Sequence, residues 1–266
     1  MYLDATNLYV AAMKESLPTG GFRWMEPHEM ETFDCTAFED TSPKGFVLEV
    51  DMDYPAALHS HHNDLPFLAE SIIPPTRKIP KLIPNLYNKK KYIIHYRNLQ
   101  QCLKYGIKLK KIHRILEFSQ SKWLGSYVAL NTNLRNNSRN EFEKDLYKLL
   151  VNSIFGKTFE NVDKRQNIKL CSCWVVYDKP LYVGFTILDI SKTIIYNFLY
   201  GYIKPMYDNG ATVLYTDTDS FILELFTDNP YQDIKNNIQF FDTSNYSIYN
   251  IHNIPKTKSV VGKMNQ

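Results

Sequence analysis

The chain contains 266 residues with a formal net charge of +3; 44% of the residues are hydrophobic and 14% are aromatic. This composition excludes a disordered chain and predicts a folded core built from one or two packed units. No apolar run reaches the ~18 residues that a membrane span needs, and no secretory hydrophobic region begins the chain, so we expect an intracellular protein with no membrane partner.

The first part of the chain is predicted to consist mainly of strands. Residues 2–10 are rich in strand-forming side chains and lead to a turn signal at 17–21, where a proline and two glycines occur. Residues 45–50 are predicted to form a second strand. Four prolines between residues 71 and 84 indicate an extended connection, because proline lacks the backbone donor that helices and inner strands need.

Helices and strands share the remainder of the chain. Residues 140–155 place apolar side chains at a helical period. Gly106 suits the end of a predicted helix at 98–105. The predicted helices are 98–105, 140–155 and 191–207, and the predicted strands are 111–118, 213–215 and 221–225. Because the two types do not alternate regularly, an α+β fold is favoured over a doubly wound parallel sheet.

The cysteines indicate neither a disulfide framework nor a zinc site. Cys35, Cys102, Cys171 and Cys173 are too few and too scattered for a set of disulfides. Cys171 and Cys173 are separated by one residue, but no histidine lies nearby to complete a zinc-binding set.

The charges are unevenly distributed along the chain. Residues 71–116 include twelve Lys or Arg side chains and no Asp or Glu, which leaves 19 basic and 28 acidic residues elsewhere, a net of −9. Tyrosines are interleaved with this basic stretch at positions 87, 92, 96 and 105. The mixture suits a surface that contacts phosphates and bases, but an ordinary solvated helix face explains the composition equally well.

Residues 215–220, Tyr-Thr-Asp-Thr-Asp-Ser, form an acidic turn between two predicted strands. Two carboxylates one residue apart at a hairpin tip can share divalent cations, and Mg²⁺ prefers such oxygen ligands. The alternative is a simple polar turn, since Asp, Thr and Ser all favour turns. Asp4, at the end of a predicted strand, is a candidate for the further acid that two-metal chemistry requires, although a helix N-cap is the default interpretation of such a residue.

The predicted helix at 140–155 carries a polar face. Lys144, Lys148 and Asn152 are spaced by four residues and therefore lie on the same side. Two lysines one turn apart repel each other unless an anion, such as a triphosphate, neutralises them. A solvated lysine face is the alternative interpretation.

The same helix has a second set of informative residues near its end. Gly156 permits close approach of a base or backbone, and Phe155 offers a flat stacking surface. Leu149, Leu150 and Ile154 are expected on the opposite side, facing the core.

Together, the three segments resemble motifs A, B and C of family B DNA polymerases, in their order and spacing. Residues 4–9, Asp-Ala-Thr-Asn-Leu-Tyr, resemble motif A, Asp-x-x-Ser-Leu-Tyr-Pro, with asparagine at the serine position and a valine following in place of proline. Residues 148–156 are similar to motif B, Lys-x-x-x-Asn-Ser-x-Tyr-Gly, with phenylalanine in place of the tyrosine. Residues 215–220 match every fixed position of motif C, Tyr-x-Asp-Thr-Asp-Ser.

The connecting sequence resembles the protein-primed branch of this family, which occurs in viruses, linear plasmids and Maverick/Polinton-type mobile elements. Residues 48–55, 58–66 and 116–123 are similar to phrases of the mobile-element group. The resemblance implies the palm and fingers of a right-hand DNA polymerase, with an antiparallel palm sheet and flanking helices. It also implies templated transfer of deoxynucleotides to a primer 3′-hydroxyl in DNA replication. The implied partners are primer–template DNA, deoxynucleoside triphosphates and a terminal priming protein.

The resemblance assigns the acids and lysines to specific roles. Asp4 and Asp219 would hold two Mg²⁺ ions, for which Mn²⁺ can substitute, and Asp217 would be the weaker ligand. Lys148, together with Lys144, would neutralise the incoming triphosphate.

Further roles concern the nucleotide and the DNA. Asn152 and Gly156 would border the nascent base pair. Tyr9 would lie beneath the sugar and exclude a 2′-hydroxyl by a clash, and the backbone amides of Leu8 and Tyr9 would contact phosphate oxygens. The basic stretch would contact DNA or the priming protein through Lys89, Lys90, Lys91, Arg97, Lys108, Lys110 and Lys111.

The implied domain organisation has four parts. Residues 1–70 would be palm, 71–130 a basic insertion, 131–180 the fingers with a short linker, and 181–266 the second part of the palm. Because the match begins at motif A, we expect the exonuclease domain to be missing. Because it stops before the lysine–tyrosine motif, we expect the thumb domain to be missing as well. The competing interpretation is a truncated, catalytically inactive polymerase relic that retains nucleic-acid binding.

Overall fold

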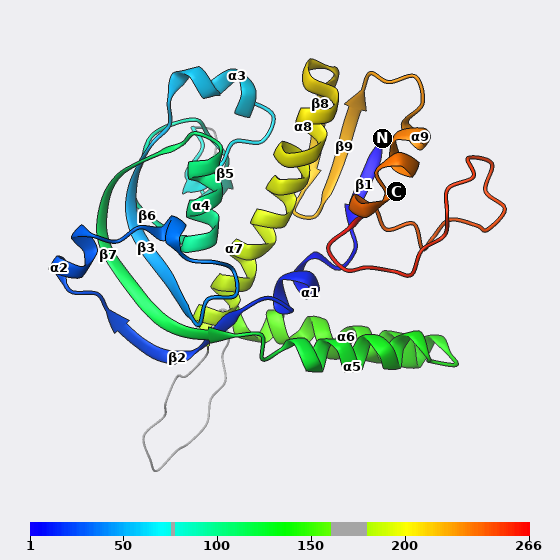
Figure 1. The fold of residues 1–266 in the computed structure, drawn as a ribbon, viewed down its shortest axis with the longest axis horizontal. Helices are drawn as coiled ribbons and strands as arrows, with labels where there is room; N and C mark the ends of the chain where they lie inside the picture. Colours follow the sequence, from blue (N-terminus) through cyan, green and yellow to red (C-terminus); the bar gives the residue numbers. More distant parts are fainter. Residues whose placement is uncertain (76–77, 161–179) are drawn as a thin grey trace, which may run out of the picture.

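Two antiparallel sheets lie on either side of the long helix α7 (Leu181–Phe198) (Figure 1). The computed structural model describes residues 1–75, 78–160 and 180–266. Cys171 and Cys173, and the linker expected after the motif B helix, lie outside the described residues. Helices and strands do not alternate regularly along the chain, so the expected α+β fold is confirmed.

The first sheet brings the two ends of the chain together. Its strand order is β10 (Met264–Asn265), β1 (Tyr2–Ala5), β9 (Ser220–Leu225) and β8 (Ala211–Asp217), and each neighbouring pair is antiparallel. Side chains alternate between the two faces of a strand. One face is therefore buried through Leu3, Phe221 and Met264, whereas the other face leaves Tyr2 and Ile222 exposed.

Phe221 is expected to be a main contributor to the stability of this sheet. Its side chain, near the start of β9, is 0% exposed and stacks on Phe198 of α7. We expect Phe221→Ala to lower the free energy of unfolding by about 3–5 kcal/mol, because the substitution leaves a cavity that the sheet cannot close. Urea denaturation measures the loss. Phe226→Ala is the matched control, since Phe226 is 71% exposed and its removal should cost less than about 0.5 kcal/mol.

The second sheet has the order β2 (Leu17–Trp24), β7 (Lys108–Ser121), β3 (Lys44–Asp53) and β6 (Lys89–His95), and helix α4 (Tyr96–Lys104) packs against it. The prediction of a turn at residues 17–21 is wrong, because these residues begin β2. The glycines there accommodate irregular pairing with β7. The domain boundary expected at residue 70 also does not match the sheets. Strand β3, which precedes it, pairs with β6 and β7, which follow it.

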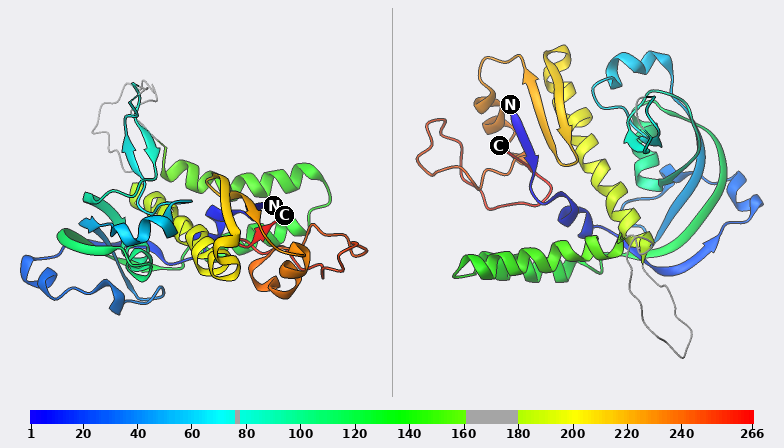
Figure 2. Two further views of the ribbon diagram at one scale, coloured as in Figure 1. Left: turned by 90° about the horizontal axis from the view of Figure 1, so that it is seen from above. Right: turned by 180° about the vertical axis from the view of Figure 1, so that it is seen from behind.

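The region between β3 and β6 projects from the second sheet (Figure 2). The extended connection expected at residues 71–84 is instead partly a ribbon of two antiparallel strands, β4 (Glu70–Ile72) and β5 (Lys81–Ile83). The short helix α3 (His59–His62) precedes this ribbon.

Helices α5 (Gly125–Asn136) and α6 (Glu141–Thr158) form an antiparallel hairpin beside α7 and α1 (Leu8–Met13). The side chain of Asn140 caps α6 by accepting a hydrogen bond of 2.8 Å from the backbone N–H of Glu143. The prediction of which α6 side chains face the core is partly wrong. Leu149 and Leu150 are 63% and 38% exposed, and Val151, at 5%, is the side chain that enters the core.

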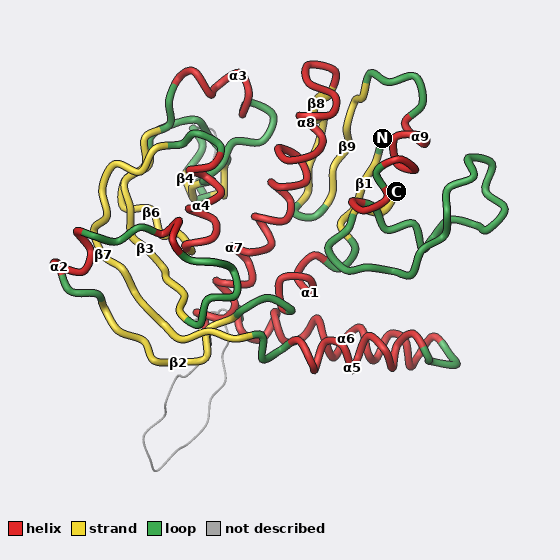
Figure 3. The backbone as a smooth tube through the Cα atoms, viewed as in Figure 1, coloured by secondary structure: helices red, strands yellow, loops and turns green. Residues whose placement is uncertain are grey.

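Helix α7 begins at Leu181 rather than at the expected Ser191, and it continues through a π-helical turn (Leu199–Ile203) into α8 (Lys204–Tyr207). The other helices are α2 (Pro27–Glu31) and α9 (Pro230–Asn236). Beyond α9 the chain runs mostly as loop until it reaches β10 (Figure 3). No helix in the described ranges combines the length and apolar character needed to cross a membrane.

Candidate active site

The acidic turn lies at the tip of the β8–β9 hairpin, beside strand β1. Thr218 takes a positive φ of 54° at this tip. Asp4 pairs in register with Ser220, and the backbone N–H of Ala5 donates a hydrogen bond of 2.7 Å to the carbonyl oxygen of Asp219. The antiparallel pairing of β1 with β9 therefore places Asp4 beside Asp219, although the two residues lie far apart in the sequence.

The carboxylates of this turn repel each other. The pKa of Asp219 is raised by its partial burial and, to a smaller extent, by the nearby charges of Asp4 and Asp217. Thr218 Oγ1 donates to Asp217 Oδ1 at 3.3 Å, and the Tyr2 hydroxyl donates to Asp4 Oδ2 at 3.3 Å. Within the described part of the chain no lysine, arginine or histidine forms an ion pair with these three acids. Their negative charge is therefore available to a cation.

The donor set at this site fits magnesium but does not form a complete protein cage. Among the described residues, no group of three or more His, Cys, Asp or Glu side chains could enclose a metal ion. Mg²⁺ is commonly held by one or two carboxylates, with water and substrate phosphates completing its shell. Asp4 and Asp219 supply two such carboxylates on one cavity, whereas Asp217 does not line that cavity.

A cavity of about 660 Å³ joins the carboxylates to the helical hairpin. Asp4, Leu8 and Tyr9 reach it from β1 and α1, and Asp219 reaches it from the hairpin tip. Four further predicted residues come from α6: Lys148, Asn152, Phe155 and Gly156 all line the cavity. The structure thus brings together residues from all three motifs.

Tyr9 and Phe155 form the aromatic contact between α1 and α6. Their rings stack with centroids 4.3 Å apart and planes 13° from parallel. Burial raises the pKa of Tyr9, and the charges of Asp219 and Asp217 raise it further. Phenylalanine at the motif B tyrosine position keeps the ring that this stack needs.

The two lysines of α6 are not equivalent. Lys148 lines the cavity with Asp4 and Asp219. Lys144 does not line it, and its ammonium group forms an ion pair of 2.6 Å with Glu141 on the same helix. The structure therefore places Lys148, and not Lys144, on the cavity with the two carboxylates.

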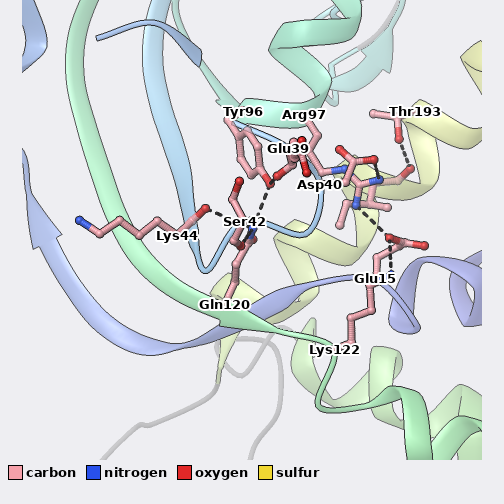
Figure 4. Close-up of polar contacts among 11 residues, drawn as sticks. Glu15, Glu39, Asp40, Ser42, Lys44, Tyr96, Arg97, Gln120, Lys122 and Thr193 are labelled. Atoms are coloured by element: carbon pink, nitrogen blue, oxygen red, sulfur yellow. Dashed lines mark hydrogen bonds and ion pairs between the residues drawn. The ribbon is translucent and has the colours of Figure 1, made fainter. Parts of the chain in front are cut away.

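Two of the basic residues expected to contact DNA are not available at the surface. Lys89 is 1% exposed, and its ammonium group forms an ion pair of 2.8 Å with Glu70. Arg97 contacts Asp40 at 2.6 Å and Glu15 at 3.4 Å (Figure 4). Both predictions are corrected, because these side chains satisfy carboxylates within the fold. Lys90, Lys91, Lys108, Lys110 and Lys111 are exposed.

Acidic side chains of a neighbouring strand also neutralise part of the positive charge of the basic stretch. Arg114 contacts Glu49 at 2.6 Å, and His113 lies 2.8 Å from Asp51. Both acids belong to β3, the neighbour of β7. The basic stretch contains no acidic residue in its sequence, but in the fold the two acidic side chains of β3 lie against it. The interleaved tyrosines are also partly withdrawn, since Tyr96 is fully buried whereas Tyr87 is 73% exposed.

Four residues of the cavity wall lie outside the three motifs. Tyr2, Asn245, Asn265 and Gln266 line the cavity beside Asp4. Their side chains carry no charge and belong to no recognisable motif. The pairing of β10 with β1, which places Asn265 opposite Asp4, has no local signal in the sequence.

An antiparallel sheet with carboxylates at a hairpin tip faces a helical hairpin that contributes a lysine and an asparagine to the same cavity. This arrangement defines the palm and fingers of a right-hand DNA polymerase. The chain belongs to the family described as DNA polymerase type B, organellar and viral, whose model matches residues 1–172.

Solved structures of the phi29 DNA polymerase share this fold. The orthorhombic crystal form matches with a TM-score of 0.58 and 17% identity over 100% of this chain and 42% of that chain. The ternary complex with primer–template DNA and incoming nucleotides gives a TM-score of 0.55 at 17% identity, over 88% of this chain and 40% of that one. The chain therefore spans about two fifths of the length of these polymerases. A comparison with curated proteins gives no match.

Proposed function

We propose that the chain is a DNA-directed DNA polymerase that transfers deoxynucleotides to a primer 3′-hydroxyl by two-metal catalysis. The proposal rests on one observation: Asp4, Asp219 and Lys148 all line the same cavity. Membership of the type B family supports the same reaction. The protein-primed type, with a terminal protein as partner, rests on the resemblance of the connecting sequence to that branch.

In the proposed reaction the primer 3′-oxygen attacks the α-phosphorus of the nucleotide, and the bond to the departing pyrophosphate breaks. Asp4 and Asp219 would hold the two Mg²⁺ ions, which, when bound, activate the 3′-hydroxyl and stabilise the charge on the pyrophosphate. Lys148 would neutralise the triphosphate from the α6 side of the cavity. Tyr9 would place its ring beneath the sugar, and Asn152 and Gly156 would border the new base pair.

We assign the first sheet to the palm and the α5–α6 hairpin to the fingers. The second sheet would contact DNA or the priming protein through its exposed lysines, namely Lys90, Lys91, Lys108, Lys110 and Lys111. Contact with the phosphate backbone would make DNA affinity fall as the salt concentration rises.

The two lysines of α6 should give different kinetic results. We expect Lys148→Ala to raise the KM for the deoxynucleotide between about 10- and 100-fold, because a charge-assisted contact with the triphosphate contributes roughly 1.5–3 kcal/mol. Lys144→Ala should change KM by less than about threefold, since its charge is already paired with Glu141 at the surface. Single-nucleotide extension at varied nucleotide concentration measures both. Equal effects would contradict the structural distinction.

Extension of a labelled primer–template by the purified chain, with Mg²⁺ or Mn²⁺, tests the proposal directly. Addition of the templated deoxynucleotide supports a polymerase. DNA binding that weakens with salt, without any incorporation, would favour the competing function, an inactive relic that retains nucleic-acid binding.

A further inference from the structure

Tyr2 is a half-exposed aromatic residue on the strand that carries Asp4. It lies two residues before Asp4 on β1, so both side chains project from the same face of the sheet. Its side chain is 51% exposed, and its burial therefore contributes little to folding. The ring instead lines the cavity that Asp4 and Asp219 share.

The hydroxyl group of Tyr2 is the specific contact of the Asp4 carboxylate. It donates a hydrogen bond to Asp4 Oδ2 at 3.3 Å. In the described parts of the chain, no other side chain donates a hydrogen bond to Asp4 or forms an ion pair with it. The contact engages Oδ2 and leaves Oδ1 free for a cation. The neighbouring charge of Asp219 would otherwise favour rotation of the Asp4 carboxylate away from the site.

We propose that Tyr2 is a positioning residue that holds the carboxylate of Asp4 in the orientation needed to bind the divalent ion. This inference rests on the proposed function, because it takes Asp4 as a ligand of that ion. A distance of 3.3 Å is long for an O–H···O hydrogen bond. The phenol therefore limits the rotation of the carboxylate without fixing it, and the oxygens can still adjust to the ion.

The substitution Tyr2→Phe removes only the hydroxyl group. We expect it to weaken Mn²⁺ binding about fivefold, below the 10–100-fold typical of buried groups that orient metal ligands, because this contact is long and exposed. The signal of free Mn²⁺ in electron paramagnetic resonance gives the affinity without any enzymatic turnover. The Mg²⁺ concentration for half-maximal single-nucleotide extension should rise by the same factor, while the rate at saturating Mg²⁺ stays within about twofold of wild type.

Tyr249→Phe is the matched control, since it removes a phenol that is 93% exposed and absent from the cavity lining. It should leave Mn²⁺ affinity unchanged. A purely structural role for Tyr2 predicts a lower Tm and a lower rate at every metal concentration, and this result would overturn the inference.

Different results would contradict the role of Tyr2 and the proposed function. If wild type binds Mn²⁺ and extends primers, and Tyr2→Phe has the same Mn²⁺ affinity, the inference is wrong and the function stands. If wild type binds no Mn²⁺, the proposed function falls and the inference falls with it.

Discussion

Asp219→Asn is expected to abolish nucleotide incorporation, with a rate at least about 10³-fold below wild type, or about 4 kcal/mol in activation free energy. The substitution removes one of the two carboxylates that line the cavity, so the remaining Asp4 cannot hold both ions. Single-turnover extension of a labelled primer measures the loss. Asp228→Asn is the matched control, because Asp228 lies exposed in the loop after β9 and should retain full activity.

The same variant should fold at least as well as wild type. Burial, Asp4 and Asp217 raise the pKa of Asp219, so its charged form is less favourable in the folded than in the unfolded chain. Wild type therefore loses stability as the pH rises from the ordinary aspartate pKa through the raised value, and the loss is complete above it. Asparagine at this position does not ionise, so the variant does not lose stability in this way.

Urea unfolding without metal tests this expectation. Asp219→Asn should match or exceed wild-type stability at pH 7, and any advantage should shrink towards pH ~4, where aspartate becomes protonated. Loss of activity together with a much lower unfolding free energy would indicate a structural role and contradict the metal assignment. Retained incorporation would overturn the proposed catalytic site.

Tyr9→Ala is expected to raise the use of ribonucleotides relative to deoxynucleotides by about 10²-fold. In the proposed complex the Tyr9 ring leaves no room for a 2′-hydroxyl, and an unrelieved steric contact costs about 1–3 kcal/mol. The stack on Phe155, with centroids 4.3 Å apart, fixes the ring in this position. Competition between the two nucleotides at one templated position, with the products resolved by length and alkali sensitivity, measures the ratio.

The matched control is Tyr9→Phe, which keeps the ring and its stack on Phe155. It should preserve sugar discrimination, because the clash comes from the ring rather than from the hydroxyl. Unchanged discrimination in Tyr9→Ala would place the sugar elsewhere in the cavity and contradict the proposed role of Tyr9. The alanine variant should also lose at least roughly 0.5–1.5 kcal/mol of stability, the value of an aromatic pair beyond the area that it buries.

The parts of the molecule that local chemistry controls could be predicted from the sequence. The β8–β9 hairpin follows from strand formers on both sides of the turn at residues 218–219. Helix α6 follows from its apolar period over residues 140–155. The resemblance of three motifs then indicated the family and most of the residues that line the cavity, including Asp4 and Lys148.

Which charged groups remain available depends on contacts between distant segments of the folded chain. Lys144 and Lys148 are alike in sequence, but one is paired with Glu141 and the other faces the cavity. Lys89 and Arg97 belong to a stretch without acids, yet both contact carboxylates from other segments. Propensity and periodicity act over a few residues, whereas strand register and ion pairs depend on partners far along the chain. For the same reason the contact between Tyr2 and Asp4, and the pairing of β10 beside them, became visible only in the folded molecule.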